Sequence, residues 1–171
     1  SYKFNDDLTG YFSYSYGEKA GISQINPGNG QSFLAKPEQV SAFELGLKSA
    51  LLDKTLIVNA DLFLSRIKNY QQTLQVIDTV RSTPTSTVYV AATGNAPLVQ
   101  TRGLEFDGVY SGIEHTTLRF SGAYTEAIYK KFPNSPQPAE NNDLTSTQPF
   151  QDVSGRTIAG APRFTYNLGI D

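Results

Sequence analysis

Apolar and polar side chains alternate residue by residue along several long stretches of this chain. In the segment 56–65 the apolar positions on one face are Leu56, Val58, Ala60, Leu62 and Leu64. The segment 43–48 alternates in the same way, and Asp53-Lys54 marks a bend between the two. Successive side chains of a β-strand point to opposite faces, so a period of two fits a strand and not a helix. The pattern predicts an antiparallel β-hairpin with one apolar face.

The length of these stretches is as informative as their alternation. The segments 41–51 and 55–69 are long enough to cross a bilayer, which takes about 9–11 residues of tilted strand. The charged side chains Glu44, Lys48 and Asp61 fall on the face opposite the apolar one. A strand of a membrane-spanning barrel needs this division, because one face meets lipid and the other meets an aqueous interior.

Turn residues and alternation together predict seven strands. We place them near 1–4, 10–18, 41–51, 55–69, 98–111, 115–130 and 162–171. Three connections are short, namely 5–8, 52–54 and 112–114. The other three are long and rich in Pro, Gly, Asn, Gln, Ser and Thr, namely 19–40, 70–97 and 131–161. Outer-membrane barrels alternate short periplasmic turns with long outward loops, whereas a sandwich gives no reason for such alternation.

Two of the long connections carry further signals. The segments 70–77 and 87–91 flank Thr83-Pro84, which predicts that one hairpin continues beyond the membrane as a solvated ribbon. The segment 133–138 contains three prolines, so we expect it to form no strand ladder.

Composition excludes several classes of protein. The hydrophobic fraction is 39%, and the longest apolar runs, 50–52 and 56–58, are far too short for a membrane helix. Membrane contact would therefore be made by strands. With 14 basic and 16 acidic residues, and a net charge of -2, the chain lacks the basic surface that nucleic acid requires.

The chain shows no apparatus for nucleophilic or phosphoryl-transfer chemistry. It has no cysteine, one histidine, and neither a G-x-S-x-G nor a Walker-type glycine motif. His115 follows Glu114 in a predicted turn, where we expect it to be solvated. We therefore expect no enzyme, no cofactor and no metal centre. The oxygen-rich run Glu140-Asn141-Asn142-Asp143 leaves calcium as an alternative to a plain polar loop.

Three sequence segments, in this order along the chain, resemble the barrel sequences of TonB-dependent outer-membrane receptors. They are Pro37–Ser49 with the later strand end Asn69-Tyr70-Gln71, then Asn95-Ala96 leading to Thr101–Glu105, and finally Ser154–Arg163. The resemblance implies a barrel of about twenty-two strands, plugged by a separate N-terminal domain. It also implies uptake of a scarce ligand, such as an iron chelate, a vitamin or a carbohydrate, with energy transmitted by TonB.

On this basis we expect residues 1–171 to form a partial transmembrane β-barrel domain, with the plug and the remaining strands outside these residues. The fold class is all-β, an antiparallel up-and-down barrel. The expected location is the outer membrane of a Gram-negative bacterium, as a multi-pass barrel in contact with lipid. The expected partners are a small-molecule ligand and the TonB complex, reached through the plug, and no nucleic acid. A passive porin-like channel and a soluble carbohydrate-binding β-sandwich remain alternatives.

The alternation of side chains along each strand indicates which residues face the interior of the barrel, and the long loops supply the candidate ligand contacts. The expected lumen-facing residues are Glu44, Lys48, Asp61, Glu105, Asp107, Arg119 and Arg163, which could pair across strands or hold a plug. The expected ligand contacts are exposed aromatic and amide groups of the long loops, namely Tyr70, Gln71, Gln72, Tyr89 and Phe132. Tyr2, Phe4, Tyr11 and Tyr110 lie near the short turns, where an aromatic girdle is expected.

Overall fold

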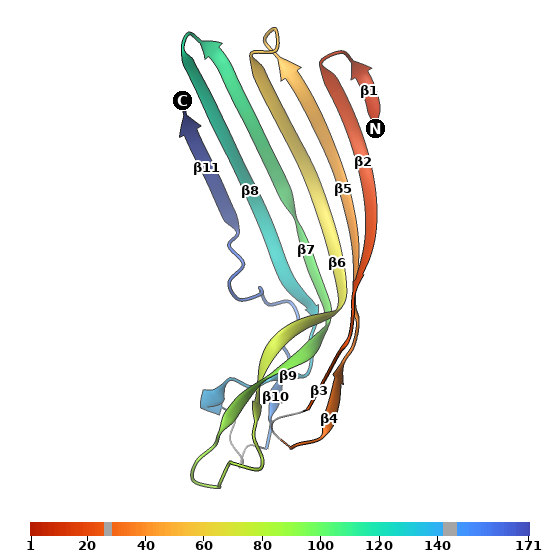
Figure 1. The fold of residues 1–171 in the computed structure, drawn as a ribbon, viewed down its shortest axis with the longest axis vertical. Coiled ribbons are helices and arrows are strands. Elements are labelled where there is room, and N and C mark those ends of the chain that lie inside the picture. Colours follow the sequence, from red (N-terminus) through yellow and green to blue (C-terminus); the bar gives the residue numbers. More distant parts are fainter. Residues whose placement is uncertain (26–28, 142–146) are drawn as a thin grey trace.

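Seven long antiparallel strands form one curved sheet that does not close into a barrel (Figure 1). The structure, a computed structural model, describes residues 1–25, 29–141 and 147–171. The sheet strands are β1 (Tyr2–Asn5), β2 (Leu8–Lys19), β5 (Glu38–Leu51), β6 (Leu56–Ile77), β7 (Tyr89–Ile113), β8 (Thr116–Lys131) and β11 (Phe164–Ile170). Each pairs with the next along the chain, in the order β1-β2-β5-β6-β7-β8-β11. The predicted partial barrel of about seven strands is confirmed, and the described residues do not form a two-sheet sandwich.

Helix contributes almost nothing to the fold. Across the described ranges the single helical element is the 3-10 turn η1 (Ala139–Asn141). None of the helical structure in these ranges is long or apolar enough to cross a membrane.

The three short turns lie together at one end of the sheet, and the long connections lie at the other (Figure 1). Between β5 and β6, residues Leu52, Asp53 and Lys54 have φ values of 52°, 54° and 67°. Such left-handed values are uncommon outside glycine, and here they let the chain reverse within the turn. The Thr55 amide closes the turn by donating to the Leu52 carbonyl at 3.1 Å.

Strands β6 and β7 continue past the sheet as the predicted ribbon. Lys68 pairs with Leu98 and Tyr70 with Ala96, while Asn69 and Pro97 between them form no pair. Pro97 has no N–H to donate to the ladder, and Asn69 has a φ of 52°. Beyond the interruption β6 and β7 pair only with each other, because the ladder from β5 ends at Lys68 and the ladder from β8 ends at Leu98. Figure 1 shows the far ends of β6 and β7 bending away from the sheet as a two-stranded ribbon.

Two small ladders lie among the long connections. Strands β3 (Ile22–Ile25) and β4 (Ser32–Ala35) form one, and β9 (Ser135–Pro136) and β10 (Phe150–Gln151) form the other. The expectation that 133–138 forms no ladder is therefore wrong. Two residues from the distant end of the same connection supply the partners, and a ladder this short tolerates one proline.

The register places apolar side chains from neighbouring strands in continuous rows on one face. One row runs straight across the sheet through Phe12, Leu45, Leu62, Leu104, Tyr124 and Phe164. These side chains remain exposed, Leu45 by 57% and Leu62 by 56%. A packed sandwich would bury such a row under a second sheet.

A small core lies at the long-loop end instead. Its buried members are Ala96, Val99, Phe132 and Val153, and partly buried Ile67, Tyr70, Leu74, Tyr129 and Ile158 pack against them. Residues of the β8–β11 connection thus cover the polar-side face of β6, β7 and β8 where the ribbon leaves the sheet.

Candidate functional site

The face opposite the apolar rows is polar and carries a group of carboxylates. Gly46, Asp61 and Glu105 are direct register partners on β5, β6 and β7. Two residues further along the same face, Asn59 of β6 is the register partner of Asp107 of β7. The Asn59 amide Nδ2 donates to Asp107 Oδ2 at 3.0 Å. Asp61, Glu105 and Asp107 line a hollow of about 400 Å³, to which β8 and β11 add Ser121, Thr165 and Asn167.

The aromatic ring of Tyr11 lies over this polar face. Its hydroxyl donates to Glu44 Oε1 at 2.5 Å, and Lys48 Nζ lies 5.4 Å from the ring centroid. Tyr11 therefore belongs to the polar face, and its assignment to an aromatic girdle against lipid is wrong. The alternation of β2 explains the correction, because Phe12 and Tyr14 already occupy the apolar face.

All seven residues that we expected to face the lumen share this polar face or its continuation, by strand register. Within the described segments, Glu44, Asp61, Glu105 and Asp107 form no ion pair, so the cross-strand pairing considered for them is not formed. Arg119 pairs with Asp171 at the short-turn end. Arg163 precedes β11, where its carbonyl accepts from the Thr125 amide at 2.9 Å.

Two of the five expected ligand contacts are buried, so their predicted exposure is wrong. Phe132 is 3% exposed within the small core, and Gln71 is 7% exposed. Gln71 Nε2 donates to the carbonyls of Ala20, at 2.8 Å, and Lys36, at 3.0 Å. These contacts tie the β2–β5 connection to the ribbon, so Gln71 acts here as a structural link.

The other three expected contacts are half-buried and also take part in packing between loops. Gln72 accepts a hydrogen bond from the Tyr129 hydroxyl at 2.7 Å. The Tyr89 hydroxyl donates to the Ala139 carbonyl at 3.0 Å. Tyr70 packs against the small core. The long connections thus form one folded cap rather than independent loops.

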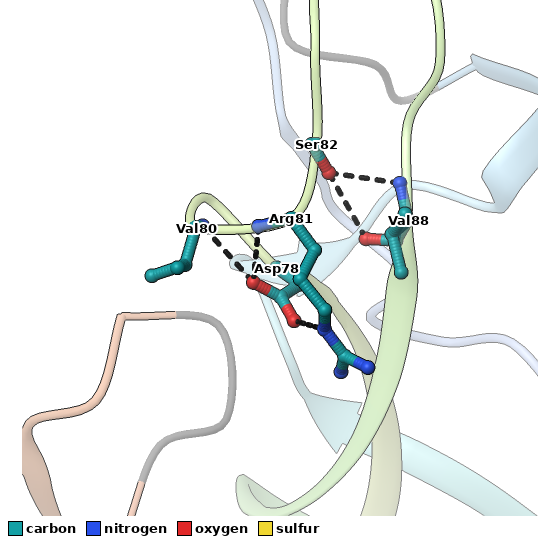
Figure 2. A network of polar contacts seen from close by, with 5 residues as sticks. All are labelled: Asp78, Val80, Arg81, Ser82 and Val88. Atoms are coloured by element: carbon teal, nitrogen blue, oxygen red, sulfur yellow. Dashed lines mark hydrogen bonds and ion pairs between the residues drawn. The ribbon is translucent and has the colours of Figure 1, made fainter.

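The tip of the ribbon is organised by one buried carboxylate, which sequence reasoning missed (Figure 2). Asp78, 1% exposed, accepts from the amides of Val80 and Arg81, both at 2.9 Å, and from the Arg81 guanidinium. The guanidinium contact, followed by the amides, lowers the pKa of Asp78. An aspartate that directly follows a strand and begins a turn is the signal that would have indicated it.

The weaker metal and histidine possibilities add no site. Asn142 and Asp143 of the calcium alternative lie outside the described residues, and Glu140 lies in η1. No group of three or more metal-ligating side chains occurs in the part of the chain that the structure describes. His115 is 91% exposed, with Nε2 3.3 Å from Glu114 Oε1, as expected for a turn residue in solvent.

A comparison with known protein families gives a match over the whole chain. The model of the TonB dependent receptor-like β-barrel family matches residues 1–171. The chain belongs to this family. TonB-dependent receptors are outer-membrane transport proteins, so lipid and an aqueous interior are the solvents that the two faces of such a barrel meet.

One solved structure is also similar to this chain. The crystal structure of the siderophore receptor PirA from Acinetobacter baumannii aligns with 97% of this chain, at 15% identity and a TM-score of 0.47. The alignment covers 24% of the PirA chain, so this chain spans about a quarter of that receptor's length.

Proposed function

We propose that this chain forms part of the wall of an active-transport receptor in the outer membrane of a Gram-negative bacterium. The receptor binds a scarce ligand at the long-loop end and imports it through a plugged lumen, using energy that TonB transmits. The observation that carries the proposal is the division of the sheet into an exposed apolar face and a polar face rich in carboxylates, in a chain that belongs to the TonB-dependent receptor family.

The polar face supports a lumen that holds a mobile plug by polar contacts. Glu44, Asp61, Glu105 and Asp107 present carboxylates that are not neutralised by cations of the described sheet, and Tyr11 orients Glu44. Arginine and lysine side chains of a plug would make charge-assisted hydrogen bonds with such carboxylates. Ion pairs between solvent-exposed groups are weak enough to break when the plug moves.

The folded cap supports ligand binding at the long-loop end. Tyr70, Gln72 and Tyr89 are the partly exposed aromatic and amide groups that remain as proposed contacts to an iron chelate, a vitamin or a carbohydrate. Gln71 and Phe132 would act indirectly, by fixing the loops that carry these groups.

Uptake by whole cells tests this function. Cells that express the full-length protein are given radiolabelled ferric siderophores, cobalamin and maltodextrins, each with and without an intact TonB gene. We expect surface binding of one probe in both strains and its accumulation in the TonB-containing strain alone. Accumulation of small solutes without TonB would indicate a passive channel, and no binding or uptake of any probe would contradict the proposal.

A further inference from the structure

A groove of about 480 Å³ lies on the outer wall of the sheet, beyond the apolar rows. It spans β2, β5, β6, β7 and β8 on the same side as Leu62. The residues that shape it include Tyr16, Phe43, Arg66, Lys68, Leu98 and Lys130. It therefore opens toward whatever surrounds the barrel and not toward the lumen.

The height of the groove follows from β6. On its apolar side, Leu56 to Leu64 cover eight residue steps, or about 27 Å of strand, which a tilt of about 40° reduces to about 20 Å of height. That height is close to the roughly 25 Å apolar band of an outer-membrane barrel. The next residues on this side are Arg66 and Lys68, so the groove lies at the edge of the band. Because it lies at the long-loop end, this edge faces the outer leaflet.

Three exposed cations converge on the groove. Arg66 and Lys68 come from β6, and Lys130 is the extra residue where the register between β7 and β8 shifts. Within the described ranges none of the three forms an ion pair.

The acids and the other cation on this side already have partners. Glu126 pairs with Arg102 at 2.5 Å, and Glu18 accepts hydrogen bonds from Tyr16 and Gln39. Tyr16 and Gln39 are neutral donors, so Glu18 keeps its negative charge. The three cations outnumber this one carboxylate, and the groove therefore has a net positive charge to offer an anion.

The floor of the groove suits a ligand that is part lipid. Phe43 contacts Tyr14, with ring centroids 4.9 Å apart, and both rings continue the apolar rows below the cations. A molecule seated here would place apolar chains against the rows and a charged head among Arg66, Lys68 and Lys130. Lysines that merely lie at a membrane edge, without binding a lipid, do not need apolar rings beside them, because their long side chains extend the ammonium group into water.

We propose that this groove binds a phosphorylated glycolipid of the outer leaflet, with Arg66, Lys68 and Lys130 contacting its phosphates. The inference rests on the outer-membrane placement proposed above. Guanidinium and ammonium groups are the usual protein partners of phosphate, and a juxtamembrane cluster of them is attracted to anionic lipid. The role of the glycolipid would be to anchor the outer rim of the wall, separately from transport.

Native mass spectrometry of the full-length protein, extracted from outer membranes in mild detergent, tests the site. The readout is the amount of lipid A-type glycolipid retained per protein. The test variant is Lys68→Gln/Lys130→Gln, and the matched control is Lys3→Gln/Lys54→Gln, which removes the same charge at the short-turn end. We expect retention to weaken by about fivefold per lysine in the test variant and to stay unchanged in the control. Lys68→Arg/Lys130→Arg should retain the glycolipid.

A second arm identifies the chemical group that is recognised. The protein is exchanged into nanodiscs that contain either bisphosphorylated lipid A or the same lipid with both phosphates removed. Retention of the first lipid alone supports the proposal. Equal retention of both lipids, or equal loss in the test and control variants, would overturn it while leaving the proposed transport function intact. Absence of the protein from the outer-membrane fraction would overturn both.

Discussion

The ring of Tyr11 on β2 occupies the space above Gly46 on β5. A Cβ atom built on Gly46 would lie 2.3 Å from Cζ of the tyrosine. The two residues are direct partners in the register, and the glycine lets the ring lie across the polar face to reach Glu44. The tyrosine ring thus covers backbone that the glycine would otherwise leave exposed on the polar face.

Replacing Gly46 with leucine should therefore destabilise the sheet. The new side chain would displace the ring and its bond to Glu44, at a cost of about 1–3 kcal/mol. Urea unfolding in detergent or lipid measures the change. Gly17→Leu is the matched control, because a Cβ at Gly17 meets nothing within 4 Å. Equal losses at the two glycines would show that the Tyr11 contact contributes nothing.

Charge substitution on adjacent residues of β6 should separate its two faces. Leu62→Arg places a cation on the apolar face, where the expected cost near the bilayer midplane is about 2–4 kcal/mol. Asp61→Arg, one residue away, should cost far less because it faces the aqueous side. The two free energies of unfolding are compared in the same lipid. Matching costs would count against the lipid-face assignment.

The ribbon tip should loosen in acid. The pKa of Asp78 is lowered in the folded chain, so its carboxylate stabilises the tip fully above the ordinary carboxyl pKa of 3.8. This contribution is lost as the pH falls below 3.8 and through the folded-state pKa, when the carboxylate becomes protonated. Hydrogen exchange at the Val88 amide, which donates to Ser82 Oγ at 2.8 Å, reports on the tip.

Asp78→Ala should give fast exchange at Val88 at every pH, because the amides of Val80 and Arg81 lose their acceptor. Asp53→Ala, in a turn at the other end of the sheet, serves as the control. Slow exchange at Val88 in Asp78→Ala would show that the tip does not depend on this carboxylate.

The bend at Asn69 should tolerate glycine and reject valine. A β-branched residue at a φ of 52° is strained, by roughly 1–2 kcal/mol, whereas glycine adopts this value freely. Both substitutions remove the bond from Asn69 Nδ2 to the Pro37 carbonyl, so their difference isolates the backbone strain. Thermal unfolding of the pair measures that difference, and identical melting temperatures would contradict the strain.

Alternation and turn residues together were enough to predict the seven strands, because lipid and water impose opposite demands on adjacent residues. The same rule, applied to β2, would have placed Tyr11 opposite Phe12 and corrected its assignment. The interruption at Asn69 and Pro97 was not predicted, since it depends on which residues stand opposite each other. A proline and an asparagine in separate strands do not reveal that pairing.

The candidate site was predicted unevenly for a similar reason. The carboxylates of the polar face could be grouped from the alternation of side chains along each strand, which is a local pattern. The burial of Gln71 depends on the Ala20 carbonyl, 51 residues away, and the burial of Phe132 depends on Val153. Contacts between long loops leave no periodic pattern in the sequence. The polar composition of these loops therefore indicated that Gln71 and Phe132 are exposed, whereas the fold buries both.

Cysteine labelling along β6 tests the central claim most directly, since this chain contains no cysteine of its own. Single cysteines at Asn59, Ala60, Asp61, Leu62, Phe63 and Leu64 are treated, in intact outer membranes, with a water-soluble maleimide. The two-faced sheet predicts modification at the three odd-numbered positions and protection by lipid at the three even-numbered ones. Equal labelling of odd and even positions would contradict the assignment of the two faces to lumen and lipid.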